Sequence, residues 1–285
     1  AFILAVAVAS AATTLRVTDP RCEYATDPLG IDVAQPRLSW RVASPERGQR
    51  QTAYRLLVAT SRDALAQERG DLWDSGRVDS EQTTLVRYAG KALVSSQEVF
   101  WKVQSWDNRG EPTPWSSIAA WTMGVLTPGE WTARWIVAPW TSEALLLRHE
   151  FTVKPGLRRA LLHVSGLGQY EASFNGTKAG DDLLSPGWTD YDTTTLYDTR
   201  DVTALLREGA NAVGLTLGNG MYNVVGRDRF AKFTHSFGPL RAIAQLELEY
   251  ADGRSERIGT DDSWRVNRGG ITYDSIYGGE DFDAR

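Results

Sequence analysis

Three carboxylates stand within four positions near the end of the chain, in the run YGGEDFDAR, as Glu280, Asp281 and Asp283. A pair of carboxylates flanking a sugar, with their carboxyl groups about 6.5–9.5 Å apart, is the acid and base of an inverting glycosidase. In an extended segment Asp281 and Asp283 project to the same face, about 7 Å apart. That spacing fits, but one short strand offers no second wall for a sugar pocket. We therefore assign no catalytic residue to this run.

Other catalytic patterns are missing from the sequence. There is no G-x-S-x-G nucleophile elbow, and the only histidines are His149, His163 and His235. His163 lies in the strand-like run ALLHVSG, which favours a structural histidine. No C-x-x-C, H-E-x-x-H or P-loop pattern occurs, so zinc chemistry and nucleotide hydrolysis have no support. The only cysteine, Cys22, has no partner for an internal disulfide.

The segment 181–201, DDLLSPGWTDYDTTTLYDTRD, is rich in aspartate and aromatic residues. Carboxylate and carbonyl oxygens from a loop are the ligands that calcium prefers, so Asp181 and Asp182 are the predicted ligands if calcium is bound. The spacing matches no EF-hand, and we expect no cofactor to be required. The alternative is a solvated loop whose aspartates cap turns and a helix start.

An aromatic face beside hydrogen-bonding side chains suits a pyranose ring, whose C–H face stacks while its hydroxyls are bonded. Trp188 is predicted to stack on the sugar, Asn175 and Asn219 to bond hydroxyls, and Tyr222 to close one side. Two alternatives remain open. The Gly-Asn-Gly sequence around Asn219 also forms tight turns. Asn175-Gly176-Thr177 reads as a glycosylation sequon, but Asn-Gly is also a strong hairpin signal, which explains this sequence without a sugar.

These residues must be positioned by strands, because apolar and polar residues alternate through much of the chain. The clearest strand is 244–250, and only 61–70 and 201–209 have the pattern of short helices. The 11 Trp and 26 Gly also suit strands that are separated by turns. The sequence therefore predicts an all-β fold with two β-sandwich domains, the first fibronectin-III/immunoglobulin-like and the second a jelly-roll (galactose-binding-like) sandwich.

The sequence also predicts how the chain is divided into a leader, two domains and a linker. We expect a truncated secretory signal at 1–14, a first sandwich at 15–125, a linker at 126–142 and a second sandwich at 143–285. The apolar run at the start is too short to span a bilayer and precedes an A-x-A-like site, which predicts a secreted, periplasmic or cell-envelope protein. A buried strand or helix is the alternative there. A net charge of −5 and a pI near 5.4 argue against a nucleic-acid partner.

Several long motifs resemble the N-terminal region of bacterial α-L-rhamnosidases of glycoside hydrolase family 78. In the first predicted sandwich they are CEYATDPLGIDVAQPRLSWRV, RGQRQTAYRLLVATS, DLWDSGRV and FWKVQSWDNRGEPTPWS. In the second they are SGLGQYEASFNGTKAGDDLLSPGWTDYD, DVTALLREGANAVGLTLGNGMYN and IYGGEDFDAR. The resemblance runs in order from about Leu15 to Arg285.

This resemblance implies an enzyme that releases terminal α-L-rhamnose with inversion from glycosides or polysaccharides. The chemistry of the family belongs to an (α/α)6 barrel, which we do not find in this sequence. The implied partners are a rhamnose-containing carbohydrate and the C-terminal catalytic barrel of the same polypeptide. In some relatives the second sandwich holds rhamnose through calcium, but Phe174 stands here where an acidic ligand is expected. The alternative function is a purely structural interaction module without affinity for sugar.

Overall fold

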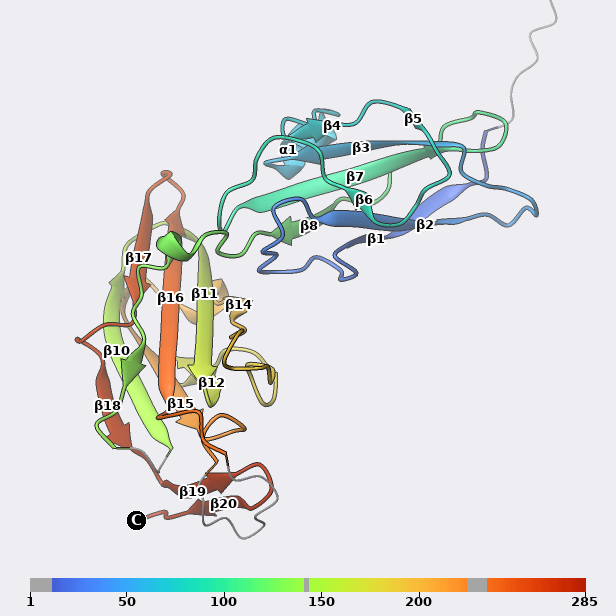
Figure 1. Cartoon of the computed structure of the whole chain (residues 1–285). Helices are drawn as coiled ribbons and strands as arrows, with labels where there is room; N and C mark the ends of the chain where they lie inside the picture. Colours follow the sequence, from blue (N-terminus) through green and yellow to red (C-terminus); the bar gives the residue numbers. More distant parts are fainter. Residues whose placement is uncertain (1–11, 141–143, 225–234) are drawn as a thin grey trace, which may run out of the picture. The chain divides into compact units, whose positions relative to one another are not determined.

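The computed structural model describes residues 12–140, 144–224 and 235–285 (Figure 1). Contacts divide the chain into two compact units, with the boundary between Leu126 and Thr127. Most of the predicted secretory signal lies outside the described residues. Within those residues, every helix is too short or too polar to cross a membrane.

The first unit is built from two antiparallel sheets and one short helix. One sheet has the order β1-β2-β6, and the other has the order β4-β3-β7-β8, with β5 also paired to β3. The elements are β1 Arg16–Cys22, β2 Arg37–Ala43, β3 Ala53–Ala59, α1 Arg62–Ala66, β4 Trp73–Asp74, β5 Val78–Asp79, β6 Val86–Arg87, β7 Glu98–Trp106 and β8 Ala119–Thr122. The core contains three fully buried tryptophans, Trp40, Trp101 and Trp121. Their size explains how short strands can still enclose an apolar interior.

The second unit contains two larger antiparallel sheets and a terminal hairpin (Figure 1). We call β13-β12-β15-β10-β18 the first sheet and β14-β11-β16-β17, with β9 paired to β16, the second sheet. The elements are η1 Pro128–Glu130, β9 Ile136–Val137, β10 Leu145–Val153, β11 Leu157–Leu167, β12 Gln169–Phe174, β13 Thr177–Lys178, β14 Asp198–Asp201, η2 Thr203–Leu205, β15 Gly209–Gly218, β16 Arg241–Tyr250, β17 Ser255–Gly259, β18 Arg265–Arg268, β19 Ile271–Ser275 and β20 Gly279–Phe282.

Alternation along the strands of the first sheet decides which side chains meet the core. In β15 Val213, Leu215 and Leu217 are buried, and the residues between them face away from the second sheet. In β10 Leu145 and Leu147 are buried in the same way. The first sheet therefore has an apolar inner face and an outer face mainly of polar and small residues, with Leu146 exposed among them.

Much of the expected linker belongs to the second unit. Thr132 donates its backbone N–H to Gln245 Oε1 at 2.7 Å, and β9 pairs with β16 through Ala242 and Arg241. Gln245 is fully buried, so the N–H of Thr132 supplies a donor that the buried Oε1 of Gln245 needs. Residues 127–140 therefore cover the second sheet of their own unit.

The Asn175-Gly176 signal gives the hairpin that it predicts. Asn175 has φ 53° and Gly176 φ 84°, and Phe174 of β12 pairs with Thr177 of β13. Two successive positive φ values are those of a type I′ turn, for which Asn-Gly is the preferred sequence. Together with the sheets of both units, this confirms the all-β prediction with two sandwiches.

Candidate functional site

The predicted sugar-binding residues do not form one site. Asn175 lies beside the start of β15, where its backbone N–H donates to Ala212 O at 2.9 Å. Asn219 follows the other end of that strand, seven residues beyond Ala212. At about 3.3 Å per residue, the two asparagines are separated by roughly 23 Å. A single sugar ring cannot reach both.

Asn219 and Tyr222 belong to the interior of the second unit. Asn219 is 1% exposed, and it donates its backbone N–H to Asp274 Oδ1 at 2.6 Å and its side-chain N–H to Asp274 Oδ2 at 3.1 Å. Burial raises the pKa of Asp274, which these hydrogen bonds partly offset. The ring of Tyr222 stacks on Phe237, with centroids 5.9 Å apart, and meets Tyr191 edge-on. Both predicted ligands therefore serve here as packing and hydrogen-bonding residues.

The acidic segment has a different role from a calcium loop. Asp182 pairs with Arg200 of β14, and this hydrogen bond and charge lower the pKa of the Asp182 carboxyl. A cation at Asp182 would have to displace the guanidinium. Throughout residues 12–140, 144–224 and 235–285, no three His, Cys, Asp or Glu side chains group as metal ligands. Asp181 and Asp182 therefore do not form a cage that fits calcium.

Trp188 is 61% exposed in the same segment. It is absent from the lining of each of the four hollows described below, so its predicted stacking on a sugar stays a prediction.

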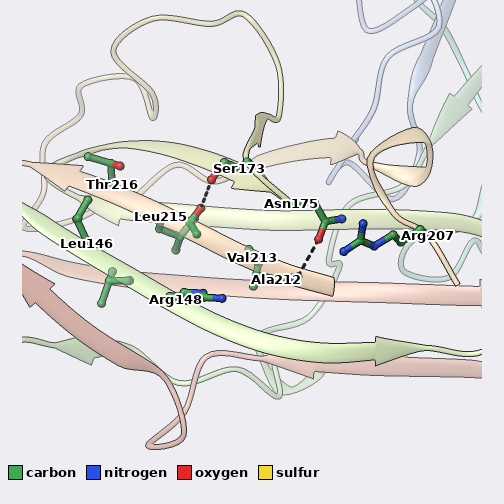
Figure 2. Close-up of a pocket in the computed structure, with 12 residues that line it drawn as sticks. Leu146, Arg148, Ser173, Asn175, Arg207, Ala212, Val213, Leu215 and Thr216 are labelled. Atoms are coloured by element: carbon green, nitrogen blue, oxygen red, sulfur yellow. Dashed lines mark hydrogen bonds between the residues drawn. The ribbon is translucent and has the colours of Figure 1, made fainter. Parts of the chain in front are cut away.

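Asn175 does line a hollow, although its own polar atoms are engaged (Figure 2). Its side-chain N–H groups donate to Leu205 O at 3.0 Å and Asn211 Oδ1 at 2.9 Å, and its Oδ1 accepts from Ala212 N at 3.0 Å. The hollow has a volume of about 510 Å³ and opens on the outer face of the first sheet. Asn175 thus fixes one end of this hollow.

One row of residues across the first sheet explains why the surface is hollowed there. The cross-strand register places Lys178, Ser173, Gly214, Arg148 and Arg265 side by side, one from each of the five strands. Gly214 stands in the middle of the row and has no side chain. A Cβ built on Gly214 would lie 3.0 Å from Ser173 Oγ. The register places Gly214 between Ser173 and Arg148, and its missing side chain contributes to the hollow there. Figure 2 labels Ser173 and Arg148 among the residues that line it.

The rest of the floor is small or neutral, and the rim is cationic. Ala212 and Thr216 flank Gly214 on the outer face of β15. Among the residues that the structure describes, Arg148 and Arg207 are the charged ones that line the hollow. Arg207 approaches Asn175 in Figure 2 and donates through Nε to Ala210 O at 3.1 Å. This arrangement presents hydrogen-bond donors around a shallow neutral floor.

Two smaller hollows extend the same face. One of about 420 Å³ shares Arg148, Asn175 and Arg207 and adds Glu150, whose Oε1 lies 2.7 Å from Arg148 Nη2. The other, of about 250 Å³, contains Arg148, Glu150 and Arg265. Arg148 and Glu150 are both more than 60% exposed, so their ion pair is weak and their side chains are available to a ligand.

A fourth hollow, of about 410 Å³, lies on the second sheet and has aromatic walls. Trp131 and Tyr197 meet edge-on with centroids 5.3 Å apart, and the neighbouring Trp135 is 40% exposed. Beneath them His163 is fully buried and contacts Thr199 Oγ1 at 2.9 Å; burial lowers the pKa of His163 to about 4. We call this the aromatic hollow.

The carboxylates at the end of the chain are part of a surface hairpin. Glu280 and Asp281 lie in β20, opposite Asp274 and Tyr273 of β19. Asp283 follows and pairs with Arg285 at 2.6 Å. None of the four hollows described above is lined by these residues.

Sequence reasoning missed Arg148, Arg207, Ser173 and Gly214. Alternation in β10 could have shown that Arg148 faces outward, because the buried Leu147 and Phe151 lie at odd positions of the strand, on the opposite face. The neighbours of β10 could not be read in this way, since β15 and β18 come from distant parts of the chain. The row across five strands exists only in the folded sheet.

Two family models match the chain. The Rha78A-like, N-terminal immunoglobulin domain matches residues 17–127, and the Alpha-L-rhamnosidase N-terminal domain matches residues 156–285. The first match falls on the first unit but for its last residue, and the second lies within the second unit. The domain identities thus agree with the two sandwiches.

Whole proteins give the same result. An alpha-L-rhamnosidase from Formosa agariphila is 32% identical over 288 residues, covering 91% of this chain and 30% of that protein. The structure of alpha-L-rhamnosidase from Dictyoglumus thermophilum superposes with a TM-score of 0.86 at 34% identity, covering 94% of this chain and 31% of the other. The crystal structure of the Streptomyces avermitilis alpha-L-rhamnosidase complexed with L-rhamnose superposes with a TM-score of 0.88 at 27% identity. The match covers 95% of this chain and 43% of that chain. This chain spans 30% of the length of the Formosa relative.

Proposed function

We propose that this chain, which has the two N-terminal domains of α-L-rhamnosidases one after the other, is the accessory region of an enzyme that hydrolyses terminal α-L-rhamnose from glycosides or polysaccharides with inversion. The second sandwich binds a rhamnose-containing carbohydrate in the hollow over Gly214. The catalytic carboxylates belong to a barrel of the same polypeptide that this chain does not include.

The observation that carries the binding proposal is the row across the first sheet. Binding pockets for small ligands typically have volumes of about 300–1,000 Å³, and this hollow has about 510 Å³. Leu146 and Ala212 offer apolar contact for the C–H face of a ring, while Ser173 and Arg148 offer donors to its hydroxyls. No aromatic side chain of the described residues lines this hollow, so the expected affinity is weak.

Calcium does not enter this proposal. At the Asn175 end of the hollow, Asn175 Oδ1 already accepts from Ala212 N, and Asn211 Oδ1 accepts from Arg207 N at 3.0 Å. The Arg207 side chain would also repel a cation there. With Asp182 engaged by Arg200, neither location offers the carboxylate set that calcium prefers.

Calorimetric titration of the 285-residue chain with L-rhamnose tests the binding proposal. Gly214→Val places a branched side chain on the floor of the hollow and is expected to weaken binding at least tenfold. Ser255→Val adds similar bulk to β17 of the second sheet and serves as the matched control, with unchanged affinity. Equal affinities of the wild type and Gly214→Val would contradict the assignment, provided that both show the same thermal transition.

A second candidate function, docking to another domain without sugar binding, is favoured by the aromatic hollow. Trp135 and Leu196 are 40% and 46% exposed beside the ring of Trp131. Exposed apolar patches of this kind mark interaction sites. Coexpression with the barrel of the parent enzyme, followed by binding assays on Trp135→Ser, separates the candidates: docking predicts loss of association, whereas sugar binding on the first sheet predicts unchanged rhamnose affinity.

We also propose that the protein is exported to the periplasm, the cell envelope or the medium. The apolar run at the start of the sequence and its A-x-A-like site support this. Cell fractionation with an antibody against the chain tests it, and an entirely cytoplasmic pool would contradict it.

A further inference from the structure

We propose that the outer face of the β1-β2-β6 sheet, in the first unit, docks onto an anionic lipid surface whose headgroups carry phosphate. We call it the arginine face, because its charged side chains on the three strands include Arg16, Arg21, Arg37, Arg41 and Arg87. The inference goes beyond the proposed function and does not depend on sugar binding by the second unit.

Strand pairing gathers these arginines on one side of the sheet. In β2 the buried residues are Leu38 and Trp40. Arg37 and Arg41 alternate with them and therefore project away from the core. The neighbouring strands add further arginines on this outer side, with Arg21 opposite Ser39, Arg16 opposite Ala43 and Arg87 opposite Arg37.

Two carboxylates neutralise part of the arginine face. Asp19 accepts from Arg21 Nε at 2.9 Å, and its other oxygen lies 3.2 Å from Arg41 Nε. Glu23 accepts from Arg37 Nε at 2.9 Å. Five guanidinium groups against two carboxylates leave a positive surface on a chain whose net charge is −5. Such a surface attracts anions selectively.

The remaining two arginines have no internal anion. Arg16 and Arg87 are exposed, and neither forms an ion pair with a residue in the described part of the chain. Arg87 also stands directly opposite Arg37 in the register. Like charges in directly opposite positions lower the stability of a sheet. An anionic partner outside the chain would relieve this repulsion.

Two side chains beside the arginine face favour a lipid surface over a soluble polyanion. Tyr24 is 60% exposed, and the guanidinium carbon of Arg37 lies 5.3 Å from the centroid of its ring. Leu85 is 36% exposed with a φ of 56°, and its N–H donates to Ser39 Oγ at 2.9 Å. That hydrogen bond fixes Leu85 at the edge of the face. Tyrosine is typical of membrane–water interfaces, and apolar side chains add affinity there by burial between the lipids.

Arginine also suits phosphate headgroups. Its planar guanidinium donates paired hydrogen bonds to phosphate oxygens and is more weakly hydrated than the ammonium of lysine. Each basic side chain near an anionic membrane surface contributes roughly a fivefold gain in affinity. Salt screens this attraction, so binding should weaken as the salt concentration rises.

Co-sedimentation of the 285-residue chain with vesicles tests the proposal. One set of vesicles is pure phosphatidylcholine, and the other is an equal mixture of phosphatidylcholine and phosphatidylglycerol. We expect at least about tenfold tighter binding to the anionic vesicles in about 0.05 M salt, and a difference below about threefold in about 0.5 M salt. Inorganic polyphosphate, titrated by calorimetry, is the soluble probe.

Arg87→Gln should weaken binding to the anionic vesicles roughly fivefold, whereas Arg87→Lys should keep most of it. Arg69→Gln is the matched control, because Arg69 is exposed just after α1, which packs on β3 and β7 of the other sheet. Leu85→Asn removes the apolar side chain at a φ that asparagine accepts, and should weaken vesicle binding about threefold without changing the affinity for polyphosphate. Thermal transitions equal to that of the wild type show that the variants are folded.

Each contrary outcome overturns a defined part of the proposal. Equal binding to both kinds of vesicle would show insertion of apolar residues without a role for the arginines. Equal losses in Arg87→Gln and Arg69→Gln would show attraction by overall charge and overturn the assignment to the arginine face. Binding to polyphosphate but to neither vesicle would identify a soluble polyanion and overturn the lipid surface. Rhamnose binding by the second unit, tested with Gly214→Val, stands or falls separately.

Discussion

Replacing Asn175 tests whether its side chain holds the fold or contacts a ligand. The side chain makes three hydrogen bonds, to Leu205 O, Asn211 Oδ1 and Ala212 N. Because the residue is exposed, each is expected at the low end of the usual range, about 0.5 kcal/mol, so Asn175→Gly should cost about 1.5 kcal/mol of stability. Asn175→Ala should cost about 1 kcal/mol more, since its φ of 53° strains a residue with a Cβ.

Urea unfolding of the whole chain, followed by circular dichroism, measures these differences. Only the transition of the second unit should move, because Asn175 lies in that unit. The order of stability should be wild type, then Asn175→Gly, then Asn175→Ala. An Asn175→Gly variant as stable as the wild type but unable to bind L-rhamnose would refute the reasoning and make the side chain a ligand.

Three further predictions use the same chain. Since burial lowers the pKa of His163 to about 4 from 6.5, its neutral form stabilises the fold fully above pH 6.5, and stability falls as pH drops toward 4. Despite the opposing attraction of Glu247, urea unfolding should show a loss of about 2 kcal/mol from pH 8 to pH 5 that His163→Gln lacks; equal losses would contradict it. If the sugar binds only over Gly214, Trp188→Ala should change rhamnose affinity less than twofold by calorimetry; a larger loss would support the predicted stacking of Trp188. Adding calcium or a chelator should leave that affinity unchanged, whereas dependence on calcium would show a cation site.

Much of the fold is readable from the sequence because strand signals are local. The alternation at Ala244 to Tyr250 marks β16, and Asn175-Gly176 marks a turn whose positive φ values few other residue pairs accept. The short helix predicted at 61–70 is present as α1, which Ser61 caps by accepting from Ala64 N. At 201–209 only the three-residue turn of η2 forms, because Asp201 is drawn into β14.

The candidate site is less readable because it depends on long-range pairing. Asn219 and Tyr222 have side chains that suit a sugar, but Asp274, far along the chain, converts Asn219 into an interior residue. Asp182 has a calcium ligand's chemistry until β14 brings Arg200 beside it. Conversely, Gly214 has no side chain that could suggest a function. Its role in the floor of the hollow follows only from the pairing that places it between Ser173 and Arg148.

The most direct test of sugar binding on the first sheet is an amide chemical-shift titration of the isotope-labelled chain with L-rhamnose. The account predicts that the largest shifts come from the outer-face rows of β10, β12 and β15, centred on Gly214, Ser173 and Arg148, and that Gly214→Val abolishes them. Shifts clustered instead at Trp131 and Trp135, or none at all at saturating sugar, would contradict it.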